Sequence, residues 1–92
     1  MSVDTKERRG NARYDYPATI EYELDTGSGQ ENRKGVTINL SRTGVCLYLF
    51  KPLGKSEEIV IKTSLPVRSK TARVRWVDKI DDDFYKAGMV FV

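Results

Sequence analysis

The stretch YDYPATIEYEL, residues 14–24, decides the fold class of this chain. Apolar and aromatic residues occupy its even-numbered positions, and polar residues such as Glu21 and Glu23 stand between them. A period of two is that of a β-strand with one buried face, so we expect a half-buried strand of about ten residues. Pro17 has no N–H to donate to a neighbouring strand, and we expect the strand to be irregular or at an edge there.

Short apolar runs separated by turn residues fill the rest of the chain. Residues 25–35 (DTGSGQENRKG) are polar and glycine-rich, and we interpret them as a hairpin loop. Further strands are expected over residues 36–40, 45–50, 57–63, 70–78 and 84–92. No stretch has a helical period. The pattern predicts an all-β fold, a small six-stranded antiparallel β-barrel over residues 14–92, preceded by a flexible basic arm over residues 1–13.

Alternation within these runs indicates which side chains enter the core. In the run at 70–78 we expect Trp76 to point into the core with Val74, rather than to serve as a base-stacking platform, and Arg75 to point outward. The run VCLYLF (45–50) is apolar on both faces, so it is expected to be a central strand with Cys46 buried. The apolar pattern continues to Val92, and a strand there is expected to have an uncovered edge unless a partner or downstream residues cover it.

Composition indicates one soluble domain without catalytic groups. Of 92 residues, 39% are hydrophobic and 32% charged, and no apolar run approaches the roughly 18 residues of a membrane span. A single cysteine indicates a reducing cytoplasm. There is no histidine, and the adjacent residues Asp81, Asp82 and Asp83 are interpreted as solvated charge rather than a metal site. We therefore expect no enzyme activity, no metal and no cofactor.

Positive charge is concentrated ahead of the first strand. The net charge is only +3, but residues 6–13 carry Lys6, Arg8, Arg9 and Arg13 against a single acid. The planar guanidinium group donates paired hydrogen bonds to phosphate and to the O6/N7 edge of guanine. The segment could bind an anionic ligand, or it could simply be a solvated basic arm.

A second motif lies in INLSRTG, residues 38–44, where Asn39, Ser41 and Gly44 have the spacing Asn-x-Ser-x-x-Gly. An amide and a hydroxyl can pair with the edge of a base, and glycine allows a positive φ or close approach of a ligand. The alternative is a tight turn in which Asn and Ser bond to the local backbone. Together with the arginines, the motif favours a purine nucleotide as ligand.

Over nearly its whole length the chain resembles the PilZ domain family, bacterial receptor modules for cyclic di-GMP. The family's Arg-x-x-x-Arg corresponds to Arg9 and Arg13, and its second motif to the turn at 39–44. The resemblance implies a split barrel with ligand on its outer surface and the arginine arm folded over it. It implies that both arginines contact phosphates and guanine faces, and that Arg8 allows two stacked ligands per site.

By the same resemblance, Asn39 and Ser41 would contact a guanine edge and Gly44 would shape the turn. Asn39 stands where aspartate is frequent, which implies weaker acceptance of the guanine N–H groups. Lys86 is either a further phosphate contact or a solvated lysine.

The expected function is that of a cytoplasmic cyclic di-GMP receptor whose arm becomes ordered on binding and signals to an unidentified partner protein. We expect a monomer or weak homodimer, without DNA binding or membrane insertion. Two alternatives stay open. One is a small-barrel binder of single-stranded nucleic acid, which would use the basic arm and exposed aromatic residues. The other is a PilZ-like adaptor that no longer binds ligand.

Overall fold

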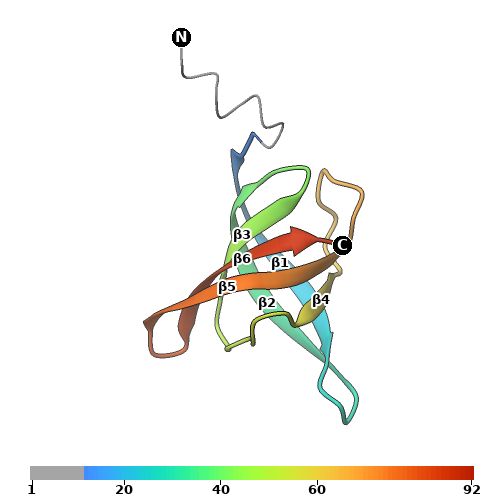
Figure 1. Ribbon diagram of the computed structural model, residues 1–92, viewed down its shortest axis with the longest axis vertical. Helices are drawn as coiled ribbons and strands as arrows, with labels where there is room; N and C mark the ends of the chain where they lie inside the picture. Colours follow the sequence, from blue (N-terminus) through green and yellow to red (C-terminus); the bar gives the residue numbers. More distant parts are fainter. Residues whose placement is uncertain (1–11) are drawn as a thin grey trace.

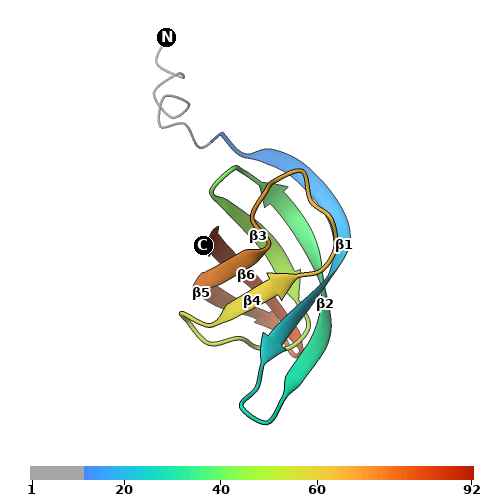
Figure 2. The ribbon, with the colours of Figure 1, turned by 90° about the vertical axis from the view of Figure 1, so that its right-hand side faces the viewer.

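The structure is a computed structural model that describes residues 12–92, and it confirms the prediction of an all-β barrel (Figures 1 and 2). The six strands are β1 (Tyr14–Asp25), β2 (Gln30–Leu40), β3 (Gly44–Leu49), β4 (Glu58–Ile61), β5 (Thr71–Asp81) and β6 (Phe84–Phe91). All neighbouring strands are antiparallel, in the closed order β1-β2-β3-β6-β5-β4.

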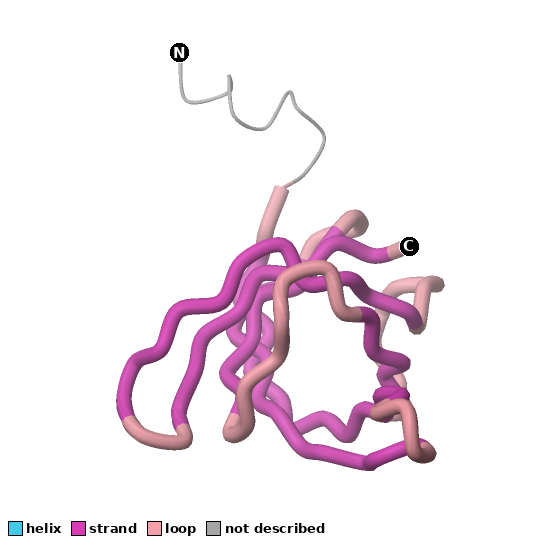
Figure 3. Tube along the Cα trace, turned by 60° about the horizontal axis from the view of Figure 1, so that its bottom comes forward, coloured by secondary structure: helices cyan, strands magenta, loops and turns pink. Residues whose placement is uncertain are grey.

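The closed order gives every strand two neighbours. Figure 3 shows the strands running around a ring. The expectation that the last strand would have an uncovered edge is therefore wrong, because β6 pairs with β3 on one side and with β5 on the other. The core is the interior of this ring. Its fully buried side chains are mostly aliphatic and come from every strand: Ile20, Tyr22, Leu40, Val45, Leu47, Leu49, Ile59, Ile61, Val74 and Ala87.

Strand β2 begins earlier than the sequence predicted, at Gln30 rather than Val36. The hairpin loop is short because Thr26 N–H donates to the carbonyl of Gly29 at 2.8 Å, and Gly27 and Gly29 both have positive φ. Two glycines at such positions close a tight turn without steric strain. The polar residues that follow were interpreted as loop, but they are strand residues: Gln30, Asn32 and Lys34 are exposed, and Glu31 and Arg33 are half-buried.

The irregularity expected at Pro17 is confirmed, because the β1–β2 register shifts between Asp15 and Ala18. At this shift, the buried Thr37 hydroxyl lies within hydrogen-bond distance of the carbonyls of Tyr16 and Ala18. A buried hydroxyl needs such a partner. Tyr14, beyond the shift, is exposed rather than on the core-facing side as its period predicted.

Two further bulges change which side chains face outward. In β2 the register shifts between Thr37 and Asn39, so that Thr37 and Leu40 are buried and Asn39 lies on the outer wall. In β5 it shifts between Val74 and Trp76. Trp76 is consequently 43% exposed, and the prediction that it belongs to the core is wrong. A bulge adds one residue to a strand and so reverses the alternation beyond it.

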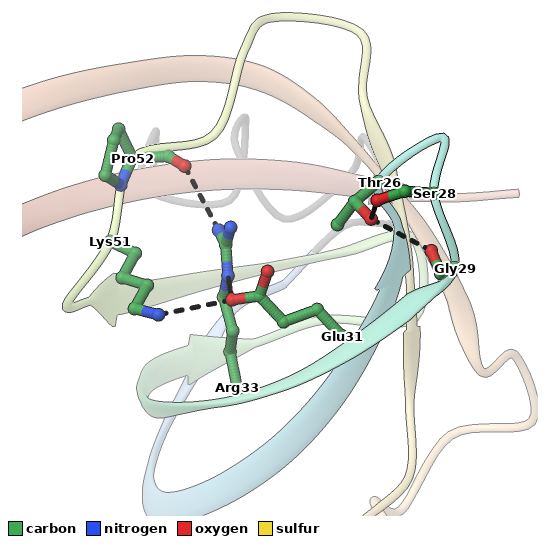
Figure 4. Close-up of polar contacts among 7 residues, drawn as sticks. All are labelled: Thr26, Ser28, Gly29, Glu31, Arg33, Lys51 and Pro52. Carbon is green, nitrogen blue, oxygen red and sulfur yellow. Dashed lines mark hydrogen bonds and ion pairs between the residues drawn. The ribbon is translucent and has the colours of Figure 1, made fainter.

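At one end of the barrel, a salt-bridge cluster ties β2 to the loop between β3 and β4 (Figure 4). Arg33 Nε lies 2.9 Å from Glu31 Oε2, and Arg33 Nη1 donates to the carbonyl of Pro52 at 3.2 Å. Lys51 Nζ approaches the same Glu31 oxygen at 3.2 Å. The hydrogen bond from Arg33, and to a smaller extent the one from Lys51, lowers the pKa of Glu31. Across residues 12–92, no helix is long and apolar enough to cross a membrane.

Candidate ligand site on the outer wall

A row of four residues crosses the outer wall of the barrel. Asn39 of β2 is opposite Cys46 of β3, Cys46 is opposite Gly88 of β6, and Gly88 is opposite Trp76 of β5. The adjacent row consists of the buried residues Leu40, Val45, Met89 and Val74. Because successive side chains of a strand point to opposite faces, the row from Asn39 to Trp76 faces outward.

Arg13 links the two sequence motifs directly. It immediately precedes β1, and its Nη1 donates a hydrogen bond to Asn39 Oδ1 at 2.8 Å. The prediction that the arginine segment and the Asn-x-Ser-x-x-Gly turn lie together therefore holds for Arg13. Arg8 and Arg9, the other two arginines predicted to bind ligand, lie outside the described residues.

The turn between β2 and β3 is held by Ser41, whose side chain is 1% exposed. Its backbone N–H donates to the carbonyl of Gly44 at 2.9 Å. Its hydroxyl oxygen accepts from the N–H groups of Thr43 and Gly44, at 3.2 and 3.1 Å. In this structure Ser41 thus bonds to the local backbone, and the geometry supports a positioning role for it.

Two glycines, Gly44 and Gly88, lie where the outer wall has no room for a side chain. A Cβ atom on Gly44 would lie 2.5 Å from the carbonyl oxygen of Met89 in the paired strand. A Cβ atom on Gly88 would overlap the indole ring of Trp76. The Trp76 side chain therefore lies across the backbone of β6 because residue 88 has no side chain.

Two adjoining pockets flank Trp76. One, of about 300 Å³, is lined by Arg13, Thr43, Gly44, Arg75, Trp76, Gly88, Met89 and Val90. The other, of about 260 Å³, is lined by Arg13, Asn39, Cys46, Trp76, Lys86 and Gly88. Arg13, Trp76 and Gly88 belong to both. The pockets together form an open, shallow surface rather than an enclosed cavity, with an aromatic ring at its centre.

Positive charge surrounds this surface. Within residues 12–92, none of Arg13, Arg75 and Lys86 forms an ion pair. Cys46 between them is buried, as predicted, and burial raises the pKa of its thiol, although Lys86 and Arg13 act in the opposite direction. The surface therefore presents cations, and the buried thiol next to them is neutral. No group of three potential metal ligands occurs in the described part of the chain. Such a surface suits a phosphate-bearing ligand with a planar ring.

Sequence reasoning placed Arg13, Asn39, Gly44 and Lys86 at the site but missed Trp76 and Arg75. The segment RVRW at 73–76 contains a visible signal, an aromatic residue interleaved with arginines. A strict period of two predicts that the Trp76 side chain points into the core. The bulge in β5 turns it to the outside instead.

The family model described as PilZ domain matches residues 7–92 of this chain. The chain therefore belongs to the PilZ domain family, whose members are in general receptors for cyclic di-GMP rather than catalysts. A search of curated proteins found no match to this chain.

Proposed function

We propose that this protein is a cyclic di-GMP receptor that binds its ligand on the outer wall of the barrel, at the two pockets beside Trp76. The observation that carries the proposal is the convergence there of Arg13, Asn39, Trp76 and Lys86 from four different segments of a PilZ domain. Family membership supports the ligand class, and the geometry of the outer wall supports this location for the ligand.

Each group has a chemical task toward this ligand. Arg13, Arg75 and Lys86 carry charges that no described acid neutralises, and they would pair with the ligand's phosphates. The exposed ring of Trp76 offers a face on which a guanine can stack. Asn39 offers an amide to a base edge. Ser41 and Gly44 fix the turn that positions Asn39.

In the proposed mechanism, ligand phosphates draw Arg8 and Arg9 onto the same wall, and a partner protein in the cytoplasm reads the rearranged surface. Fixing each arm residue costs about 1–2 kcal/mol, so several charge-assisted contacts must form together. Arg8 would favour a stacked pair of ligands. Loss of one arginine should therefore weaken binding severely, because the remaining contacts no longer offset the cost of ordering.

Calorimetric titration with cyclic di-GMP tests the proposal. We expect Arg13→Ala to weaken binding by about a hundredfold, the loss of charge-assisted contacts worth about 1.5–3 kcal/mol plus the alignment of Asn39. Arg68→Ala is the matched control, because Arg68 is exposed and lines a different pocket. Parent-like affinity of the Arg13→Ala protein would contradict the proposed site.

An exposed tryptophan on a basic wall is also what a single-strand nucleic-acid binder uses, so the same titration includes a short single-stranded DNA. We expect no saturable DNA binding at physiological salt. Binding of DNA with steep salt dependence, and without competition by cyclic di-GMP, would favour that alternative. Absence of binding to either would favour an adaptor role.

A further inference from the structure

Three aromatic side chains form a stacked patch on the outer wall, beside the candidate ligand site. The ring of Phe84 in β6 stacks on that of Tyr48 in β3, with centroids 4.9 Å apart, and on that of Phe50 at 6.0 Å. Phe50 is 44% exposed, and the other two side chains are half-buried. This aromatic patch (Tyr48, Phe50 and Phe84) leaves apolar area in contact with water, which the docking of a partner would remove.

Two carboxylates lie next to the aromatic patch. Across the β5–β6 hairpin, Asp81 is opposite Phe84 and Asp78 is opposite Lys86 (Figure 1). Opposite residues of an antiparallel pair project from the same face, so both acids belong to the outer wall. Both are exposed, and neither forms an ion pair with a described residue. Because cations bind to aromatic faces as well as to carboxylates, this surface suits Lys or Arg side chains beside an apolar anchor.

We propose that the aromatic patch docks a basic, apolar segment of a partner protein, and that cyclic di-GMP strengthens the docking. An apolar side chain of the partner covers Phe50 and Phe84, and its cationic side chains pair with Asp78 and Asp81. A second copy of this chain, docked symmetrically through the same patch, would bring like carboxylates together, so the charges favour a partner of opposite charge. The effect of cyclic di-GMP rests on the proposed function, whereas the docking surface does not.

Lys86 connects the aromatic patch to the candidate ligand site. It is opposite Tyr48 on one side and Asp78 on the other, and it lines the pocket of about 260 Å³ beside Trp76. Without ligand, its positive charge opposes the approach of a basic segment. A ligand phosphate paired with Lys86 would remove this repulsion, so the partner's cations would be attracted more strongly to the two carboxylates.

The experiment measures fluorescence anisotropy of two short labelled peptides, one of alternating leucine and lysine and one with glutamate in place of lysine. We expect the lysine peptide to bind saturably and the glutamate peptide to bind at least about tenfold more weakly. Phe50→Ala should weaken binding of the lysine peptide by about tenfold, because it removes the exposed ring. Val60→Ala is the matched control, an exposed apolar residue of β4, and should bind as the parent does.

The charged groups have separate expected effects. Asp81→Asn should weaken binding of the lysine peptide by about two- to fivefold, the range of an exposed ion pair. Saturating cyclic di-GMP should strengthen binding to the parent by a similar factor. Lys86→Ala should bind the lysine peptide more tightly without ligand and should respond less to cyclic di-GMP. Phe50 lines neither pocket of the candidate ligand site, so Phe50→Ala should keep the parent's affinity for cyclic di-GMP in calorimetry, which also shows that it is folded.

The outcomes separate the docking surface from the proposed function. Equal binding of the lysine peptide by Phe50→Ala and Val60→Ala, or equal binding of the two peptides by the parent, overturns the docking surface. Docking that requires Phe50 but does not change with cyclic di-GMP, in a protein that binds cyclic di-GMP, overturns the coupling alone. Docking that requires Phe50 in a protein that binds no cyclic di-GMP overturns the proposed function and leaves the docking surface standing.

Discussion

Gly88 shows at the scale of one residue how the outer wall is made. It lies between Cys46 and Trp76 in the row that crosses the wall, and the Trp76 indole occupies the space where a side chain at 88 would be. The indole ring can lie against the backbone of β6 because Gly88 has no Cβ atom. This arrangement makes residue 88 as important for the site as the residues that would touch ligand.

Gly88→Ala should displace Trp76 and weaken cyclic di-GMP binding by about tenfold or more, since stacking on an aromatic ring contributes about 1–3 kcal/mol per base. Calorimetry measures the affinity, and the emission maximum of the single tryptophan reports the displaced ring. Gly54→Ala is the control, because a Cβ atom there meets only the Glu57 side chain, at 3.4 Å. Parent-like affinity and emission in Gly88→Ala would show that the ring position does not matter.

The sequence predicted some residues of the candidate site and not others, for a physical reason. Arg13, Asn39 and Gly44 were predicted because their types and spacing carry recognisable chemistry, and the structure places them along the same two pockets. Trp76 was not, because an aromatic residue at a core-facing period is indistinguishable from a core residue until the bulge is known. Bulges depend on pairing between strands, which a single run of residues does not encode.

At the scale of elements, the β2–β3 turn carries the second motif. Ser41 stabilises this turn with its backbone N–H and with a hydroxyl that accepts two N–H groups. The bulge just before the turn directs Asn39 outward. Together, the turn and the bulge make one end of this hairpin part of the proposed ligand surface.

Ser41→Ala should lower the free energy of unfolding by about 1–3 kcal/mol, because the buried N–H of Gly44 loses an acceptor. Urea denaturation measures the change as a lower midpoint at constant slope. Ser28→Ala, in the exposed β1–β2 turn, is the control and should change stability much less. Equal effects of the two substitutions would contradict the role assigned to Ser41.

The β2–loop cluster in Figure 4 predicts a pH dependence. Because Arg33 and Lys51 lower the pKa of Glu31 in the folded state, the cluster stabilises the fold above the unfolded pKa of this carboxyl. That contribution is lost as pH falls through the lower, folded pKa. Glu31→Gln should therefore destabilise the protein slightly at pH 7 and change its stability little near pH 3.

Thermal unfolding of parent and Glu31→Gln between pH 7 and pH 3 measures this difference, and Glu21→Gln, on an exposed residue of β1, is the control. The expected effect is small, since the Glu31 carboxylate is accessible to solvent and the pairs are screened. A difference in melting temperature between parent and Glu31→Gln that grows toward low pH would contradict the expected direction of the pH dependence.

The strands themselves were largely predictable, because half-buried strands have a period of two and turns are marked by glycine and polar residues. β2 was predicted too short, since its first residues, from Gln30 to Lys34, are polar or charged and resemble a loop. They form a strand because the opposite residues of β1 provide backbone partners. Closure of the ring between β1 and β4 rests on long-range pairing that no local pattern reveals.

At the scale of the whole molecule, the closed barrel leaves only its exterior for a ligand. The interior is filled by buried aliphatic side chains such as Leu47 and Ile61. The wall formed by β2, β3, β6 and β5 carries the row from Asn39 to Trp76, and Arg13 reaches it from the start of β1. We propose that cyclic di-GMP binds on this wall.

A two-dimensional ¹H–¹⁵N NMR titration with cyclic di-GMP tests that claim most directly. Trp76 is the only tryptophan, so its indole N–H gives a single side-chain signal at the centre of the proposed site. We predict saturable shifts of this signal and of the amides of Asn39, Gly44 and Gly88, with little change in β4. Shifts confined to β4 and the first half of β1, or no shift at saturating ligand, would contradict the account.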